Sequence, residues 1–204
     1  MNILITAGPT WVKIDEVRIL TSIFTGKTGM YIARAFHQKG HRVTLLGNLR
    51  REMDRGVRVI PFTYFEDFKK KICRELMQGR YDVIIHSAAV SDYILRKPFS
   101  GKIPSGKIGL EVSLKPAEKI IRLIRRLTKK AIIIQFKLEI KRKGLLDKAY
   151  KSLVENKSDF VVANALEDLR RGYQAFILDK NRKMIRVSSK KMLTKALVSL
   201  ISER

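Results

Sequence analysis

Short apolar runs alternate with amphipathic segments along most of this chain. The runs carry no glycine, and the apolar residues between them recur every three or four positions. This alternation is typical of a parallel sheet that is buried on both faces by helices. The pattern predicts strands at residues 2–6, 42–46, 57–60, 82–86, 131–136 and 160–163, and helices at residues 27–39, 65–77, 117–127 and 145–155.

The C-terminal part of the sequence follows a different pattern. Two apolar runs, 175–178 and 184–187, flank a polar turn and predict a hairpin. Ser188 or Ser189 could then cap a last helix that reaches Leu200. The fold class that we expect is α/β, a Rossmann-like three-layer fold with a mostly parallel sheet and a C-terminal β-hairpin plus helix.

Length and composition fit one domain. The chain has 204 residues without repeats or low-complexity linkers, so we expect a single domain over 1–204. It contains no run of about 18 apolar residues, and its first residues do not form a signal peptide. The only cysteine, Cys73, excludes an internal disulfide and lies in a helical pattern, where we expect it to pack. We therefore expect a cytoplasmic protein without a membrane segment.

The charge is strongly positive. Lys and Arg total 43 against 19 acidic residues, which gives a net charge of +24. Such a balance points to an anionic partner, either a nucleic acid or a nucleotide or phosphorylated metabolite. The basic pairs are spread along the chain without interleaved aromatic residues, so most of them predict solvated faces, and nucleic acid is the weaker alternative.

Two glycine-containing segments are candidates for anion binding. Gly8, Pro9 and Thr10 follow the first predicted strand, where glycine lets a ligand approach the backbone. Thr25-Gly26-Lys27-Thr28-Gly29 opens the first predicted helix, whose N-terminal amides favour an anion. The second segment is not a P-loop, because Thr21 stands where that motif needs glycine. Without a ligand, both segments would still serve as ordinary turns.

A third candidate follows the strand at 82–86. Small residues lead to Asp92, which could bind a metal or a nucleobase amino group or could only cap the loop. Lys102, nine residues beyond Tyr93, could neutralise a polyphosphate or could only be solvated. Tyr93 and Lys97 match the Tyr-x-x-x-Lys pair of short-chain dehydrogenases, but Pro98 disfavours the helix that this pair requires.

Polar residues also end the last two parallel strands. Residues 135–139 and 161–165 bring amide, lysine and carboxylate groups to the same edge of the sheet. We expect Glu139 to be an ion-pair partner rather than a general base. His37, His41 and His86 show no spacing typical of metal ligands.

Taken together and in this order, these segments resemble phosphopantothenate–cysteine ligase, also called phosphopantothenoylcysteine synthetase, in its stand-alone bacterial form. The likeness covers essentially the whole chain. The matching segments are ILITAGPT (3–10), IDEVR (14–18), TGKTG (25–29), AAVSDY (88–93), KI (102–103), FKLE (136–139), AYKSL (149–153) and AN (163–164).

The resemblance implies a two-step reaction in coenzyme A biosynthesis. The carboxylate of 4′-phosphopantothenate attacks the α-phosphate of CTP with the help of Mg²⁺, and L-cysteine then displaces the nucleotide from the acyl-nucleotide intermediate. The FKLE segment is also similar to that of eukaryotic relatives that use ATP, so ATP remains an alternative to CTP. The family forms homodimers in which a segment near Lys102 reaches toward the partner subunit, and we expect the same here.

The resemblance also implies roles for individual residues. Lys102 and Ser22 are the expected catalytic residues, and Asp92 is the expected metal ligand. The expected nucleotide-binding residues are Ala88, Ala89, Asp92, Lys102, Glu118, Lys119, Ile120, Ile121, Phe136 and Lys151. The expected phosphopantothenate and phosphate loops contain Gly8, Pro9, Thr10, Thr25, Gly26, Lys27, Gly29 and Asn164.

Three positions depart from the family pattern. Ser22 replaces an asparagine that handles the acyl-nucleotide intermediate, and serine is shorter and lacks the two-sided hydrogen bonding of an amide. Glu155 stands where a second lysine is expected, and Ala165 where an aspartate is usual. The alternative function is therefore a divergent nucleotide- or nucleic-acid-binding homologue that has lost part of the ligase reaction.

Overall fold

A computed structural model describes residues 1–49, 52–106 and 108–203. Within these residues the main sheet has eight strands, six of them parallel. Their bounds are β1 (Asn2–Ala7), β4 (Arg42–Gly47), β5 (Arg58–Pro61), β6 (Val83–His86), β9 (Ile132–Glu139), β10 (Phe160–Ala165), β11 (Ala175–Asp179) and β12 (Met184–Val187).

The strand order is that of a doubly wound sheet. The order β5-β4-β1-β6-β9-β10 is 3-2-1-4-5-6 along the chain, and β11 and β12 extend it as an antiparallel hairpin. The expected α/β fold and C-terminal hairpin are thus confirmed. In such a sheet the connections leave a crevice at the carboxyl ends of the strands, beside the first strand, where ligands bind.

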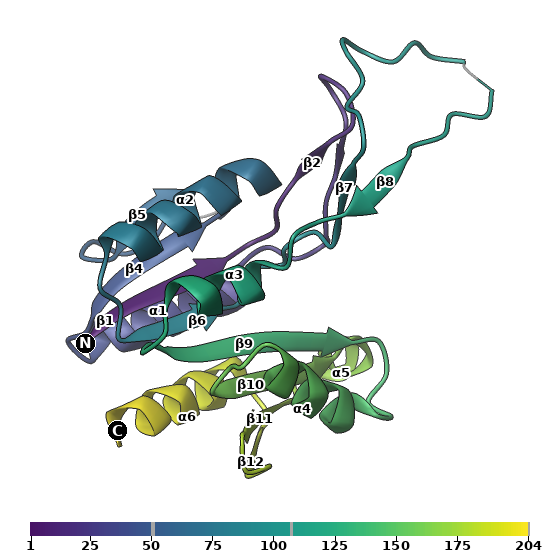
Figure 1. Cartoon of the computed structure of the whole chain (residues 1–204). Coiled ribbons are helices and arrows are strands. Elements are labelled where there is room, and N and C mark those ends of the chain that lie inside the picture. Colours follow the sequence, from purple (N-terminus) through teal and green to yellow (C-terminus); the bar gives the residue numbers. More distant parts are fainter. Residues whose placement is uncertain (50–51, 107, 204) are drawn as a thin grey trace.

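Helices cover both faces of the sheet (Figure 1). Their bounds are α1 (Lys27–Gln38), α2 (Phe65–Gln78), α3 (Ile120–Leu127), α4 (Leu145–Glu155), α5 (Leu166–Arg171) and α6 (Lys190–Ser202). One core packs α1 and α6 against side chains such as Ile5 and Ile134, and a second packs α2 and α3 against Leu4 and Ile133. A third core packs α4 on β10. Alternation along the strands therefore assigns each side chain to one of two faces.

Most element boundaries fall close to the expected ones. The helix expected at 117–127 begins at Ile120, because residues 117–119 are still extended as they leave a short strand. The strand expected at 57–60 runs over Arg58–Pro61, with Pro61 on the edge strand, where no neighbour needs its missing N–H. The short helix α5 was not expected.

The two long loops build an arm that projects away from the sheet (Figure 1). They form two small antiparallel ribbons, β2 (Val12–Lys13) with β3 (Ile19–Leu20) and β7 (Tyr93–Leu95) with β8 (Leu114–Pro116). Tyr93 therefore lies in a strand, as the argument against a dehydrogenase required. In the described part of the chain, no helix is both long enough and apolar enough to cross a membrane.

Asp15 ties the two loops of the arm together. Its carboxylate accepts hydrogen bonds from the backbone N–H groups of Val17 at 2.8 Å, Arg18 at 2.6 Å and Ile103 at 3.0 Å, and it pairs with the Arg18 guanidinium. Burial acts to raise the pKa of Asp15, but these donors outweigh it and hold the pKa well below its usual range. The ionised carboxylate thus joins segments 88 residues apart in sequence.

Candidate active site

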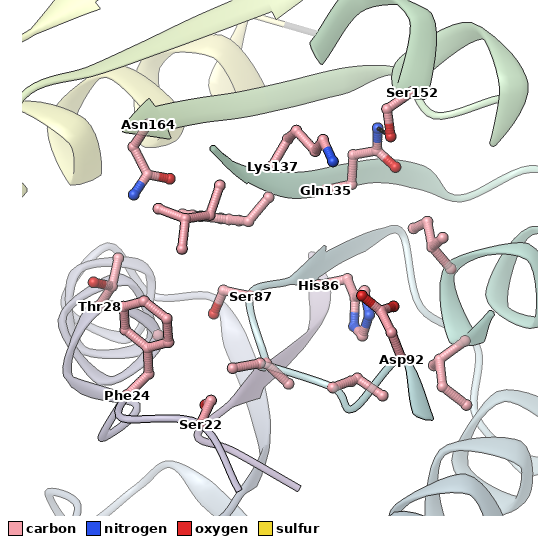
Figure 2. Close-up of a pocket in the computed structure, with 18 of the residues that line it drawn as sticks. Ser22, Phe24, Thr28, His86, Ser87, Asp92, Gln135, Lys137, Ser152 and Asn164 are labelled. Atoms are coloured by element: carbon pink, nitrogen blue, oxygen red, sulfur yellow. Dashed lines mark hydrogen bonds between the residues drawn. The ribbon is translucent and has the colours of Figure 1, made fainter. Parts of the chain in front are cut away.

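A pocket of about 980 Å³ opens at the carboxyl ends of β1, β6, β9 and β10. Figure 2 shows its floor between Ser87 and Lys137, with Phe24 and Thr28 at one end and Asp92 at the other. This position is the crevice of a doubly wound sheet, and the volume suits a ligand of nucleotide size.

Glycines bring the backbone close around the first end of the pocket. Gly8 has a φ of +86°, and a Cβ there would lie 1.9 Å from the backbone oxygen of Asn48. Gly26 has a φ of +76° before α1, and a Cβ on Gly29 would lie 2.8 Å from Ser87 Oγ. Only glycine fits these three positions, so the backbone itself forms the wall that faces the ligand.

Ser22 lies beside these glycines with an unused hydroxyl. Its Oγ is buried and has no hydrogen-bond partner among the described residues, although it lines the pocket. An unpaired buried hydroxyl costs stability. Functional sites are a common place for such a cost, because a ligand can supply the missing partner.

Charged groups gather at the second end of the pocket. The Asp92 carboxylate lies 2.6 Å from Lys119 Nζ, and both side chains are exposed. Glu118 also lines the pocket, and it pairs with Lys69 at 2.8 Å and Arg126 at 3.3 Å, which neutralise its charge. Ile120 and Ile121 at the start of α3 supply an apolar wall.

Lysines from β9 and α4 line another side of the pocket. Glu139 pairs with Lys148 at 2.8 Å and Lys137 at 3.1 Å, and the hydrogen bond from Lys148 lowers its pKa. The carboxylate is therefore an ion-pair partner, as expected. Lys151 is 4.0 Å from Glu155 with its side chain 78% exposed, so its ammonium group can turn to an anion.

The described residues contain no cluster of three or more His, Cys, Asp or Glu side chains that could hold a metal ion by themselves. Asp92 offers one carboxylate in the pocket. Mg²⁺ is commonly bound by one or two carboxylates together with substrate phosphates, and Asp92 fits that arrangement.

Most of the expected site residues meet in this pocket. It is lined by Gly8, Ser22, Thr25, Gly26, Lys27, Gly29, Ala88, Ala89, Asp92, Glu118, Lys119, Ile120, Ile121, Phe136, Lys151 and Asn164. Pro9 and Thr10 do not line it. Instead, Thr10 Oγ1 accepts a hydrogen bond from the Ser91 N–H at 2.9 Å and so joins the two loops.

Lys102 is the main exception. It lies on the projecting arm beside Ile103, exposed and outside the lining of its own chain's pocket. The backbone N–H of its neighbour Ile103 donates to the Asp15 carboxylate at 3.0 Å, so Lys102 is part of the arm. A role for Lys102 in this pocket remains a prediction.

Other lining residues were not expected from the sequence. Lys148, Ser152 and Glu155 line the pocket together with Lys151, a spacing of one helix face. The polar residues on this helix face were the only sign of these site residues in the sequence, but such a face usually contacts solvent. Thr28, which lies in the expected anion-binding segment 25–29, also lines the pocket, as do Phe24, Ser87, Tyr173 and Lys190, which were not among the expected site residues.

The fold and the site define the class as a Rossmann-like α/β protein with a nucleotide-sized pocket and a wall built on glycines. The family model of the DNA/pantothenate metabolism flavoprotein C-terminal domain matches residues 1–204. The chain belongs to this family.

Known proteins extend the comparison. The coenzyme A biosynthesis bifunctional protein CoaBC of Thermococcus kodakarensis is 33% identical over 168 residues, which cover 81% of this chain and 41% of that protein. The crystal structure of a DNA/pantothenate metabolism flavoprotein from Streptococcus pneumoniae has a TM-score of 0.89 and 27% identity, and covers 100% of this chain and 99% of that one.

A third comparison concerns a complex. A Cab2 mutant bound to phosphopantothenate-cysteine has a TM-score of 0.81 and 20% identity over 99% of this chain and 86% of that one, a likeness of fold alone. The chain spans less than half the length of curated relatives such as the CoaBC proteins of Thermococcus kodakarensis and Bacillus subtilis, at 41% and 48%.

Proposed function

We propose that this chain joins 4′-phosphopantothenate to L-cysteine in coenzyme A biosynthesis, using CTP through an acyl-nucleotide intermediate. The observation that carries the proposal is the two-ended pocket. A glycine wall with an unpaired Ser22 hydroxyl lies at one end, and Asp92 with the start of α3 lies at the other. A phosphorylated acid and a nucleotide can therefore meet above β6 and β9.

In the first step the carboxylate of phosphopantothenate attacks the α-phosphorus of CTP and pyrophosphate leaves. Both reactants are anionic, so positioning and charge neutralisation supply most of the catalysis. Backbone groups of Gly8, Gly26 and Gly29, with Lys27 and Asn164, hold the phosphopantothenate end. Ala88, Ala89 and Phe136 contact the base, and Lys119 and Lys151 face the phosphates.

In the second step the amine of cysteine attacks the acyl carbon, the amide forms, and CMP leaves. Ser22 lines the glycine end of the pocket, and its free hydroxyl can donate one hydrogen bond to an oxygen of the acyl half of the intermediate. Asp92 is the residue that would hold Mg²⁺, and the ion would neutralise negative charge on the triphosphate.

Lys102 belongs to the same proposal through a homodimer. Lys102 is outside the lining of its own chain's pocket, and the arm projects from the sheet (Figure 1), so a second copy can receive Lys102 in its pocket. Exposed apolar side chains on the arm, among them Ile108, Val17 and Tyr93, support such a contact. The dimer is cytoplasmic in this proposal, as coenzyme A biosynthesis requires.

The test is an assay of the purified chain with 4′-phosphopantothenate, Mg²⁺ and either CTP or ATP, with and without cysteine. We expect pyrophosphate release with CTP and an amide product only when cysteine is present. Pyrophosphate without amide would indicate a homologue that has lost the second step. No pyrophosphate with any triphosphate would overturn the proposal.

A further inference from the structure

A buried polar cluster lies under the second end of the pocket. Gln135, in the middle of β9, is only 3% exposed, yet its side chain lines the pocket. It is in register with His86 on the neighbouring strand β6 (Figure 2). Ser152 and Asn156 reach it from α4, and Ser158 reaches it from the turn after α4.

The contact with Arg122 determines which way the side-chain amides of Asn156 and Gln135 are oriented. A guanidinium group can only donate, and Arg122 Nε lies 3.4 Å from Asn156 Oδ1. The Asn156 amide nitrogen therefore faces inward and donates to Gln135 Oε1 at 3.0 Å and to Ser152 Oγ at 3.1 Å. Gln135 Oε1 also accepts from Ser158 Oγ at 3.2 Å, which leaves its nitrogen toward Ser152.

Two polar hydrogens of the cluster have no acceptor in the described part of the chain once these hydrogen bonds are counted, one on Ser152 and one on Gln135. Ser152 Oγ accepts from Asn156 and from Gln135 Nε2 at 3.2 Å, which fills both lone pairs and leaves its own hydrogen to donate. Gln135 Nε2 has a second hydrogen beside the one it gives to Ser152. Among the described residues, neither hydrogen has an acceptor, and both side chains line the pocket.

We propose that Ser152 and Gln135 read the nucleobase of the triphosphate, each donating one hydrogen bond to adjacent acceptors on its edge. The inference rests on the proposed function, because it concerns the base end of the same pocket. The two donor atoms are 3.2 Å apart, so they suit acceptors on neighbouring ring positions. Cytosine offers such a pair, with N3 for the Ser152 hydroxyl and O2 for the Gln135 amide. Uracil carries a hydrogen on N3, which would meet a donor.

The test compares two serine variants in the same network. Ser152→Ala removes the free hydroxyl that lines the pocket, whereas Ser158→Ala removes a buried hydroxyl that does not line it. Each change takes one hydrogen bond from Gln135, and Ser152→Ala also takes one from Asn156, so both variants carry a structural cost. Binding of CTP and of UTP to each full-length protein is measured by titration calorimetry with Mg²⁺.

We expect the unchanged protein to prefer CTP over UTP by at least about tenfold, the effect of one hydrogen bond. Ser152→Ala should reduce that ratio about tenfold, and Ser158→Ala should keep it. A ratio that stays the same in Ser152→Ala, or falls equally in both variants, overturns the inference. Pyrophosphate release by the unchanged protein tests the proposed function separately, so the two failures are distinguishable.

Discussion

The imidazole Nδ1 of His86 lies 2.9 Å from the hydroxyl oxygen of Thr6, which also accepts the Ala88 N–H at 3.1 Å. The contact joins β1 to β6, and the tautomer of the ring decides which of the two atoms donates. Burial lowers the pKa of His86 to about 4. A neutral histidine thus sits at the floor of the pocket and fixes the loop that begins at Ala88.

This arrangement predicts how stability depends on pH. The pKa of His86 is about 6.5 in the unfolded chain and about 4 in the folded protein, so the unfolded chain binds a proton at a higher pH. The free energy of unfolding should therefore fall as the pH drops from about 6.5 to about 4, by up to ~1.4 kcal/mol per pH unit. Urea denaturation at several pH values, compared with His86→Asn, measures the contribution. Equal slopes in the two proteins would contradict it.

Removal of the Asp15 carboxylate should loosen the arm. In Asp15→Asn one oxygen becomes a donor and faces the N–H groups that now donate to Asp15. We expect faster hydrogen exchange at residues 12–20 and 93–103 with little change in the sheet. Glu16→Gln is the control, because the Glu16 side chain pairs with Lys13 alone among the described residues and takes no part in the Asp15 contacts. Similar exchange in both variants would argue against Asp15 as the tie.

The free hydroxyl of Ser22 should contribute to activity but not to the stability of the fold. Ser22→Ala removes a buried oxygen that has no partner among the described residues, so the melting temperature should stay the same or rise slightly. Turnover should fall about tenfold, the effect of one lost hydrogen bond to the intermediate. Ser22→Asn should keep or raise turnover. A large loss of stability in Ser22→Ala would show that the hydroxyl is structural.

Lys102 should act on the pocket of the partner subunit. Because the side chain is exposed, Lys102→Ala should leave the melting temperature within about 1 °C and strongly reduce pyrophosphate release. Mixing it with Ser22→Ala after subunit exchange should recover about a quarter of the activity, since mixed dimers contain one intact site. Each variant alone gives the baseline. No recovery on mixing would place both residues in the same subunit's site.

The local sequence pattern was sufficient to predict the parallel strands and the helices that cover them. Strand and helix positions follow from the period of the apolar residues, and the glycine segments after β1 and before α1 follow from their place at strand and helix ends. Ala88, Ala89, Asp92 and Phe136 could be placed at one edge because parallel strands end at the same edge. Each of these inferences needs only neighbours in sequence and one topological rule.

The sequence by itself determined the doubly wound sheet and the edge where the pocket opens, because burial imposes its period on every strand and helix. Only the tertiary structure decided the rest. The arm depends on Asp15 meeting Ile103, and the donor pair depends on Ser152 of α4 meeting Gln135 of β9. Such contacts join distant segments, and no local period encodes which polar side chain is left without a partner once the chain has folded.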